Sequence, residues 1–278
     1  MRVILGLTLI ISIFHLSVGQ SGLTDEMKET ENQLYASNKQ INQFFRRFNG
    51  EEDDQGNRYY SSDKKYRDPS LRKKYLPALF DTETSQIDSR LAQEFVKKII
   101  DKKSPVFLNF HEDDWFAEVT TDFIFKGKKI SGLLYMRLQK QGQGYEWIID
   151  DVAFDQFQNL FDKDTSETKK FMHPLSHELD FMTLRKAFLG NNHAEQFTGR
   201  KYTPDFLTIF IYEMNQGNLK FETVKNVKFH FFSVPGWYFS LANFNRPGYN
   251  TGWLISGLVP IESPDQEKQL KDYIYNKN

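Results

Sequence analysis

The feature of this chain that most constrains its fold is an internal similarity between two stretches, which begin near Glu118 and Glu222. Glycine and aromatic residues recur in both stretches at one offset, through three predicted strands. The matches are Glu118 with Glu222, Phe125 with Phe229, Gly132 with Gly236, Gly144 with Gly248 and Tyr145 with Tyr249, and after a short insertion Trp147 with Trp253. Self-similarity at a fixed offset is typical of a duplicated unit. The sequence therefore predicts two copies of one fold in tandem.

The first residues have the composition of a secretory signal peptide. Arg2 precedes an apolar run from Val3 to Leu16, and small residues follow in Ser17-Val18-Gly19. This pattern predicts cleavage before Gln20. A membrane anchor is the alternative, but the run is short for a span and lacks a charged stop. We expect residues 1–19 to be removed and the rest of the chain to hold no integral membrane segment.

Charge and cysteine content exclude several classes of protein. The 36 Lys and Arg nearly balance the 37 Asp and Glu, which argues against a nucleic-acid partner. The chain has no Cys, so an exported protein of this kind must be held by its core, to which 26 Phe contribute. The absence of an Asn-x-Ser/Thr acceptor site favours a bacterial protein. We expect the periplasm, the cell surface or the medium as its location.

Hydrophobic periodicity places helices before strands in both copies. In the first copy we expect helices from Thr24 to Phe48, after the Asp68-Pro69 cap and from Ser85 to Ile100, then strands between Val106 and Phe154 that turn at Lys126-Gly127-Lys128 and Gln141-Gly142-Gln143-Gly144. In the second copy we expect helices from Ser176 and Thr203-Pro204, strands between Leu219 and Ile261 that turn near Pro235-Gly236 and Arg246-Pro247-Gly248, and a last helix from Ser263-Pro264. Helices followed by an antiparallel meander indicate an α+β fold.

The predicted domains are residues 20–155 and 172–278, joined by a linker at 156–171 that includes the polar run Asp162 to Glu167. Apolar residues occupy both faces of the strand that begins at Trp253. One face is expected to pack on the helices of its own copy, and the other on the sheet of the second copy. We therefore predict two domains packed sheet to sheet, as an internal pseudo-dimer that is a monomer in solution.

A terminal strand of the type Trp147-Ile148-Ile149-Asp150-Asp151-Val152, after helices and a bent meander, resembles the nuclear transport factor 2-like superfamily of cystatin-like α+β cones. The second copy departs from this pattern at Ser256 and Gly257. The resemblance implies two tandem cone-like domains in an exported bacterial member. Because the superfamily contains isomerase-like enzymes, dehydratases and non-catalytic members, it implies no particular reaction.

His111 and the three carboxylates Glu112, Asp113 and Asp114 could form a general acid-base pair or a metal site just before Trp115. Neighbouring residues of an extended chain point to opposite sides, so at most two of these side chains can converge. A solvated turn is the interpretation that we favour.

Two further patterns suggest metal ions, but neither completes a site. His173 and His177 have the spacing of zinc ligands on a helix, yet a cap at Ser176 places His173 outside that helix. The acidic stretch from Glu51 to Asn57 is similar to a calcium loop, but Ser62 stands where such a loop needs a bidentate Glu. We therefore expect no metal and no cofactor.

Aromatic residues on the predicted strands are the candidate ligand-binding residues, with core packing as the alternative for each. They are Tyr135, Trp147, Trp237, Tyr238 and Trp253. A polar group such as Asp150 or His230 would be needed to orient a ligand among them. The chain has no Cys nucleophile, Gly-x-Ser-x-Gly motif, phosphate loop or dinucleotide fingerprint.

These observations predict a non-catalytic exported binding or scaffold protein, with an unknown small molecule or an envelope protein as its partner. The alternative is a small-molecule isomerase or hydrolase that uses a buried carboxylate with a raised pKa, for which Asp150 is the candidate. Only the first copy could work in this way, because Ser256 stands in the second. An Asp150 that is already paired with Lys or Arg at the surface would remove the catalyst from this alternative.

Overall fold

The computed structural model describes residues 41–53, 56–158, 160, 198, 202–246 and 250–276. The chain divides into two units, Met1–Gln43 and Phe44–Asn278, and the fold and the site lie in the second. The expected signal peptide, most of the 156–171 linker, the helix from Ser176, and His173 and His177 all lie outside the described residues. In the described part of the chain, no helix is long and apolar enough to cross a membrane.

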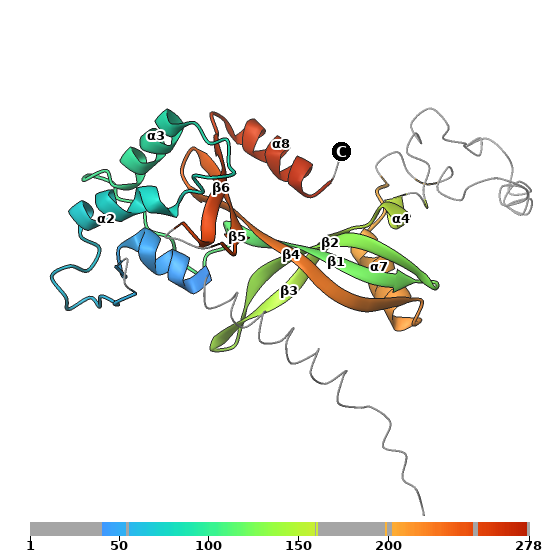
Figure 1. Cartoon of the computed structure of the whole chain (residues 1–278). Helices are drawn as coiled ribbons and strands as arrows, with labels where there is room; N and C mark the ends of the chain where they lie inside the picture. Colours follow the sequence, from blue (N-terminus) through green and yellow to red (C-terminus); the bar gives the residue numbers. More distant parts are fainter. Residues whose placement is uncertain are drawn as a thin grey trace, which may run out of the picture. The chain divides into compact units, whose positions relative to one another are not determined.

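Six antiparallel strands form one open sheet in the order β3-β2-β1-β4-β5-β6 (Figure 1). The strands are β1 (Trp115–Phe125), β2 (Lys128–Gln141), β3 (Gly144–Ala153), β4 (Leu219–Val234), β5 (Trp237–Phe244) and β6 (Gly252–Pro260). Together with the helices they make an α+β fold, as the sequence predicts. The turns predicted at Lys126-Gly127-Lys128, at Gln141 to Gly144 and at Pro235-Gly236 are confirmed.

The two meanders, β1-β2-β3 and β4-β5-β6, meet edge to edge and not face to face as predicted. Strand β1 pairs with β4 from Trp115 opposite Phe231 to Phe125 opposite Leu219. This pairing satisfies backbone groups that two stacked sheets would leave along open edges. It leaves β3 and β6 as the outermost described strands.

The residue-by-residue match between the two stretches is wrong, although the order of three strands recurs. Phe125 ends β1, whereas Phe229 lies within β4. Gly132 lies within β2, whereas Gly236 lies in the turn between β4 and β5. The glycine that occupies the equivalent turn between β1 and β2 is Gly127, and both turn glycines have a positive φ, 81° and 78°. Turn chemistry therefore gives the better alignment of the two meanders.

Helices flank the strands. They are α2 (Pro69–Tyr75), the 3-10 helix η1 (Leu76–Leu79), α3 (Ser89–Ile99), the short α4 (Asp155–Gln158), α7 (Phe206–Asn215) and α8 (Pro264–Ile274), and residues 44–49 are also helical. The predicted caps Asp68 and Ser263 are confirmed. Two starts are corrected: Asp88 and Asp205 accept the first backbone N–H groups of α3 and α7, in place of Ser85 and Thr203.

Helix α3 precedes the first meander but packs on the second, and α7 precedes the second meander but packs mainly on the first. In α3, Phe95 lies 5.3 Å from Trp237 and 5.5 Å from Phe239 of β5, ring centre to ring centre. In α7, Phe210 lies 5.7 Å from Phe123 of β1. Figure 1 shows α2 and α3 near β5 and β6, and α7 at the other end of the sheet, where it contacts β3 and also β4. This arrangement corrects the expectation that each copy covers its own sheet.

The segment after η1 explains why α3 packs on the second meander, because this segment is hydrogen-bonded to β6, the outer strand of that meander. Phe80 forms a parallel bridge with Ile255 of β6, and the backbone N–H of Asp81 donates to the Ile255 carbonyl at 2.9 Å. Helix α3 follows this segment directly and is therefore held over β5 and β6.

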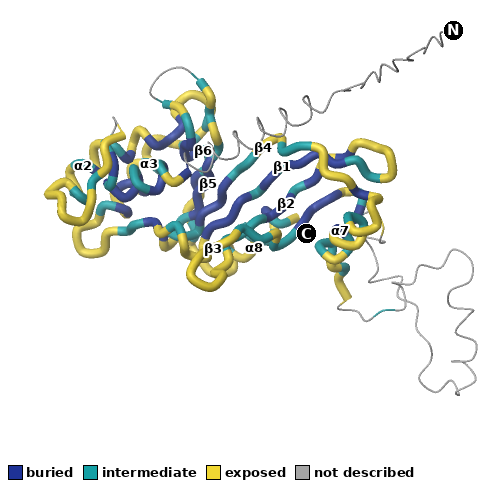
Figure 2. Tube along the Cα trace, turned by 90° about the horizontal axis from the view of Figure 1, so that it is seen from below, coloured by how far each residue is buried: buried dark blue, intermediate teal, exposed yellow. Residues whose placement is uncertain are grey.

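Helix α8 packs on the sheet face opposite to Trp115. Successive residues of a strand point to opposite faces, so Trp115 packs on Phe45 while Phe116 joins a buried cluster with Tyr135, Tyr238 and Ile274 of α8. Figure 2 shows the buried strands between more exposed helices and turns. This face, called here the α8 face, carries the candidate site.

Candidate functional site

A cavity of about 360 Å³ opens on the α8 face at the end of α8. Its floor follows from the strand register, because Thr120 of β1 lies opposite Leu133 of β2, which lies opposite Ala153 of β3. Three neighbouring strands thus place one hydroxyl and two apolar side chains in a row on one face. Ser131 of β2 lies on the same face as Leu133 and also lines the cavity, so the floor combines polar and apolar groups.

The rim of the cavity comes from two helices that lie on either side of this row. Helix α4 contributes Asp155 and Gln158, and the end of α8 contributes Tyr273 and Asn276. Asn276 follows the helix in the left-handed conformation, with a φ of 51°, which Asn tolerates better than most residues. The C-terminal cap of α8 thus brings an amide side chain to the cavity.

Four polar side chains of the lining make no hydrogen bond within the described part of the chain: Thr120, Asp155, Gln158 and Tyr273. Others are engaged. Ser131 Oγ donates to Asp122 Oδ1 at 2.5 Å, and Asn276 Nδ2 donates to the Tyr135 hydroxyl at 3.3 Å. The engaged groups stiffen the cavity wall, and the four uncommitted ones are available to a ligand.

Beside the cavity, a buried chain of polar groups links both meanders. His230 Nδ1 lies 2.8 Å from the Tyr238 hydroxyl, and His230 Nε2 lies 3.2 Å from Glu118 Oε2. Burial lowers the pKa of His230, while the hydrogen bond and the charge of Glu118 oppose this shift. A neutral imidazole then accepts a hydrogen bond from the Tyr238 hydroxyl at Nδ1 and donates one from Nε2 to Glu118.

The end of α8 is fastened over this polar chain. The Tyr135 hydroxyl donates to the Ile274 carbonyl at 2.5 Å, and the Tyr275 ring lies 4.5 Å from the Tyr135 ring and 4.8 Å from Phe116. Burial raises the pKa of Tyr135, Tyr238 and Tyr275 above the ordinary phenol value. The phenols thus stay protonated and act as structural donors.

The predicted ligand-binding aromatics are divided between the two faces of the sheet. Tyr135 and Tyr238 lie together on the α8 face, whereas the three tryptophans lie on the other. Trp147 packs 5.5 Å from Trp115, Trp237 packs 5.3 Å from Phe95, and Trp253 packs 4.8 Å from Phe229. None of the five lines the cavity described above.

Asp150 does not line the cavity either. Its Oδ2 accepts from the Tyr275 hydroxyl at 3.4 Å, and its Oδ1 lies 3.7 Å from Arg137 Nε. The Asp150 side chain is 31% exposed and that of Arg137 is 43% exposed. This is the surface pairing that removes the catalyst from the isomerase or hydrolase alternative.

The acidic motifs do not form metal sites within the described residues. His111 and the three carboxylates after it are exposed, and the His111 ring lies 4.2 Å from that of Tyr145. In the acidic stretch, the buried Glu52 pairs with Arg46 and Arg47 at 2.7 and 3.3 Å. No group of three or more His, Cys, Asp or Glu in the described part could hold a metal ion.

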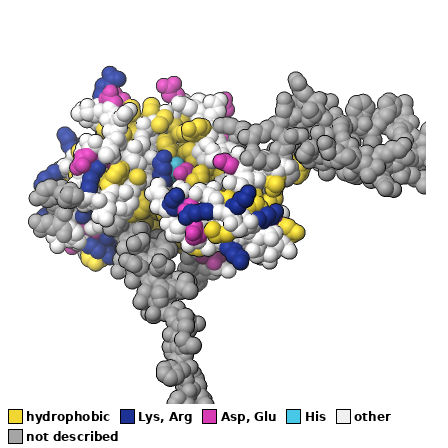
Figure 3. Space-filling view, turned by 45° about the vertical axis from the view of Figure 1, so that its right-hand side comes forward, with side chains coloured by type: hydrophobic (Ala, Val, Ile, Leu, Met, Phe, Trp, Pro, Cys, Tyr) yellow, Lys and Arg dark blue, Asp and Glu magenta, His cyan; other side chains and the backbone are white. Residues whose placement is uncertain are grey.

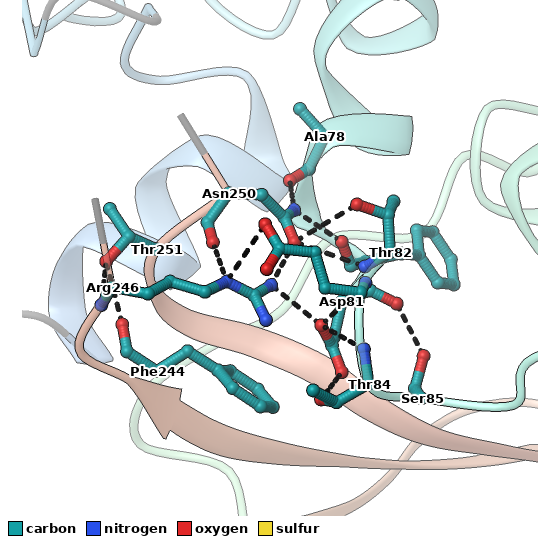
Figure 4. Close-up of polar contacts among 11 residues, drawn as sticks. Ala78, Asp81, Thr82, Thr84, Ser85, Phe244, Arg246, Asn250 and Thr251 are labelled. Carbon is teal, nitrogen blue, oxygen red and sulfur yellow. Dashed lines mark hydrogen bonds and ion pairs between the residues drawn. The ribbon is translucent and has the colours of Figure 1, made fainter. Parts of the chain in front are cut away.

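A second polar cluster, built around the buried Asp81, joins the Asp81 loop to the end of β5 (Figure 4). Arg246 donates to Asp81 Oδ1 at 2.7 Å and to the Asn250 carbonyl at 2.6 Å, and the Asn250 amide donates to the Phe80 carbonyl at 2.7 Å. Every group labelled in this cluster is bonded to another, so it fastens two segments together and leaves no group for a ligand.

Comparison of the chain with family models, with curated proteins and with solved structures finds no match in any of the three. The fold and the site thus define an α+β protein with one open six-stranded sheet and a cavity at the end of its last described helix. Sequence reasoning missed the cavity residues Thr120, Asp155, Gln158 and Tyr273. They come from three elements, β1, α4 and α8, and no spacing in the sequence relates these elements.

Proposed function

We propose that this protein is a non-catalytic binding protein and that it takes a small molecule into the cavity at the end of α8. The observation that carries the proposal is the lining, which combines the apolar side chains of Leu133 and Ala153 with four uncommitted polar side chains. Ligand sites are typically clefts of about 300–1,000 Å³ with a few converging polar groups, and this cavity lies at the lower end of that range.

The same residues argue for binding without catalysis. Acid-base chemistry needs a group within hydrogen-bond reach of the substrate and with a pKa suited to proton transfer. The Glu118–His230–Tyr238 chain is covered by α8, with His230 1% and Tyr238 6% exposed. The carboxylate at the cavity, Asp155, is exposed to solvent. The chemistry available at the cavity is therefore recognition.

We also propose that the protein is exported and that it is a monomer with domain boundaries at residues 155 and 172. We propose further that it descends from a duplicated cone-like unit of the nuclear transport factor 2-like type. Two meanders with equivalent glycine turns, and helices exchanged between them, support a duplication in which each copy lent its helices to the other. Figure 3 shows charged side chains of both signs mixed with hydrophobic ones on one face, which agrees with a partner that is not a nucleic acid. Mass spectrometry of the exported protein should find Gln20 as its first residue.

The binding proposal is tested by a thermal-shift screen of small molecules, because a ligand that binds only the folded state raises its stability. The variant Thr120→Met fills the cavity from its floor. Thr223→Met is the matched control, since Thr223 is also half-buried on a neighbouring strand but does not line the cavity. A hit should stabilise the wild type and the control but not Thr120→Met. Equal stabilisation of all three would exclude the cavity, and a flat screen with a co-purified envelope protein would favour the scaffold role.

A further inference from the structure

We infer that the cavity binds a small, neutral, polyhydroxylated compound of the sugar or polyol class. The inference rests on the proposed binding function and adds the chemistry of the ligand. It is drawn from the charge of the lining, from its hydrogen-bonding capacity and from one exposed aromatic ring.

The charges of the lining oppose the binding of an anion and would attract a cation only weakly. Neither Lys nor Arg lines the cavity, and Asp155 would repel a carboxylate or a phosphate. A cation would find one carboxylate at an exposed position, where water screens the attraction. A neutral ligand is not repelled by Asp155, and its binding does not depend on an attraction that water screens.

The polar groups of the lining favour a ligand that carries hydroxyl groups. The Thr120 hydroxyl and the Gln158 amide can each donate and accept, whereas Asp155 only accepts. Asn276 uses its Nδ2 on Tyr135 and so offers its side-chain oxygen as an acceptor. Ligand hydroxyl groups both donate and accept, and they can satisfy all of these partners at once. An apolar ligand would instead leave them desolvated and unpaired, which costs free energy.

Tyr273 supplies a surface for the less polar face of such a ligand. Its side chain is 68% exposed, the largest value among the exposed large hydrophobic residues. It lies on α8, a helix whose other exposed residues are mainly charged or amide-bearing. A phenol ring packs through its face and hydrogen-bonds through its hydroxyl, and Leu133 and Ala153 add apolar side chains to the same lining.

The test is an NMR titration of the full chain with glucose, glucosamine and gluconate, with maltose as a larger neutral member. The first three compounds share hydroxyl groups and differ in charge. Saturable shifts of backbone amides measure binding directly, which matters because sugars also stabilise proteins without binding them. Two variants test the site: Tyr273→Ala removes the ring, and Asn276→Gly keeps the left-handed backbone but removes the amide.

We expect glucose or maltose to shift the amides of Leu133, Ala153 and Asn276 saturably, and Tyr273→Ala to weaken the affinity by about fivefold to tenfold. Asn276→Gly should also weaken it while α8 stays helical by circular dichroism. Tighter binding of glucosamine or gluconate at the same amides would overturn the ligand class and leave the binding site in place. No saturable shift from any of the four compounds would overturn this inference, whereas the proposed site itself is decided by the thermal-shift screen with Thr120→Met.

Discussion

His230 Nδ1 lies 2.8 Å from the hydroxyl of Tyr238, across the hairpin of β4 and β5, while Nε2 of the same ring reaches Glu118 on β1. One imidazole thus connects strands of both meanders beneath α8. Burial of this ring lowers its pKa, so the connection depends on the imidazole being neutral.

The stability of the protein should therefore fall as the pH decreases from about 8 to about 5. Because the pKa of His230 is lower in the folded state, the unfolded chain takes up a proton first, from its ordinary pKa of 6.5 downward. The free energy of unfolding then decreases with decreasing pH until the folded pKa is reached. Urea unfolding at several pH values measures this slope. It should be shallower in His230→Gln and unchanged in His111→Gln, at an exposed position. An identical slope in both variants would contradict the assignment.

Replacing Arg72 by Met should cost about 3 kcal/mol or more, because it leaves three backbone acceptors without their donor. Arg72 is 2% exposed and donates to the carbonyls of Phe48, Ile99 and Val106 at 3.1, 3.4 and 2.6 Å. Burial, with the nearby charge of Arg67, lowers its pKa to about 10, so it stays charged at neutral pH. Chemical denaturation measures the loss. Lys73→Met, at an exposed position of the same helix, should change stability by less than about 0.5 kcal/mol.

Gly132→Ala should destabilise the protein by about 1–3 kcal/mol through overpacking. A Cβ atom at this position would lie 2.2 Å from the ring of Phe154, which covers β2 there. The double variant Gly132→Ala with Phe154→Leu should recover part of the loss. Gly144→Ala is the control, since its nearest atom would be 3.9 Å away. Equal effects at the two glycines in thermal unfolding would show that contact with Phe154 is not the cause.

Breaking the Asp81–Arg246 pair should loosen the segment between η1 and α3. Burial alone would raise the pKa of Asp81, but bonds from Thr84, Arg246 and two backbone N–H groups lower it far below its ordinary value. The carboxylate thus stabilises the fold above pH 3.8, and this contribution is lost as the pH falls further. Arg246→Met should cost about 3–5 kcal/mol, because it leaves a buried charge unpaired. Limited proteolysis should then cut the Thr82–Ser85 loop faster, and no change in cleavage would contradict the role of the pair.

In native-state hydrogen exchange, the backbone amides of α3 and β5 should become exposed together, although β1, β2 and β3 lie between these elements in the sequence. Phe95→Ala removes a ring that is 0% exposed and should cost about 3–5 kcal/mol. The loss should appear as faster exchange in β5, next to Trp237 and Phe239. Phe210→Ala in α7 should act on the first meander in the same way. Faster exchange around the wrong meander in either variant would contradict the exchanged packing.

Local chemistry made much of the fold predictable. Asp68-Pro69 and Ser263-Pro264 cap α2 and α8 as expected, because a cap needs only a side-chain oxygen and the N–H groups that follow it. Turn glycines such as Gly236 mark strand ends for the same reason, since a positive φ is a property of one residue. The starts of α3 and α7 were misplaced by a few residues because several side chains nearby could have served as caps.

Local sequence patterns could not predict the candidate site. The aromatics singled out by residue type, Trp147 and Tyr238 among them, proved to be on opposite faces, because strand parity and bulges decide the direction of each side chain. Asp150 is the extra residue of such a bulge in β3 and lies beside Arg137. Thr120 and Tyr273 carry no signal of their own, and they become neighbours when α8 docks on the sheet.

The sequence by itself determined the α+β class, most turns and two of the helix caps, because each depends on residues within a few positions of one another. The tertiary structure alone decided that β1 pairs with β4, that Phe95 covers the second meander and Phe210 the first, and that a cavity opens beside α8. These choices depend on burial and edge pairing summed over residues far apart in the chain, where many arrangements share the same local pattern.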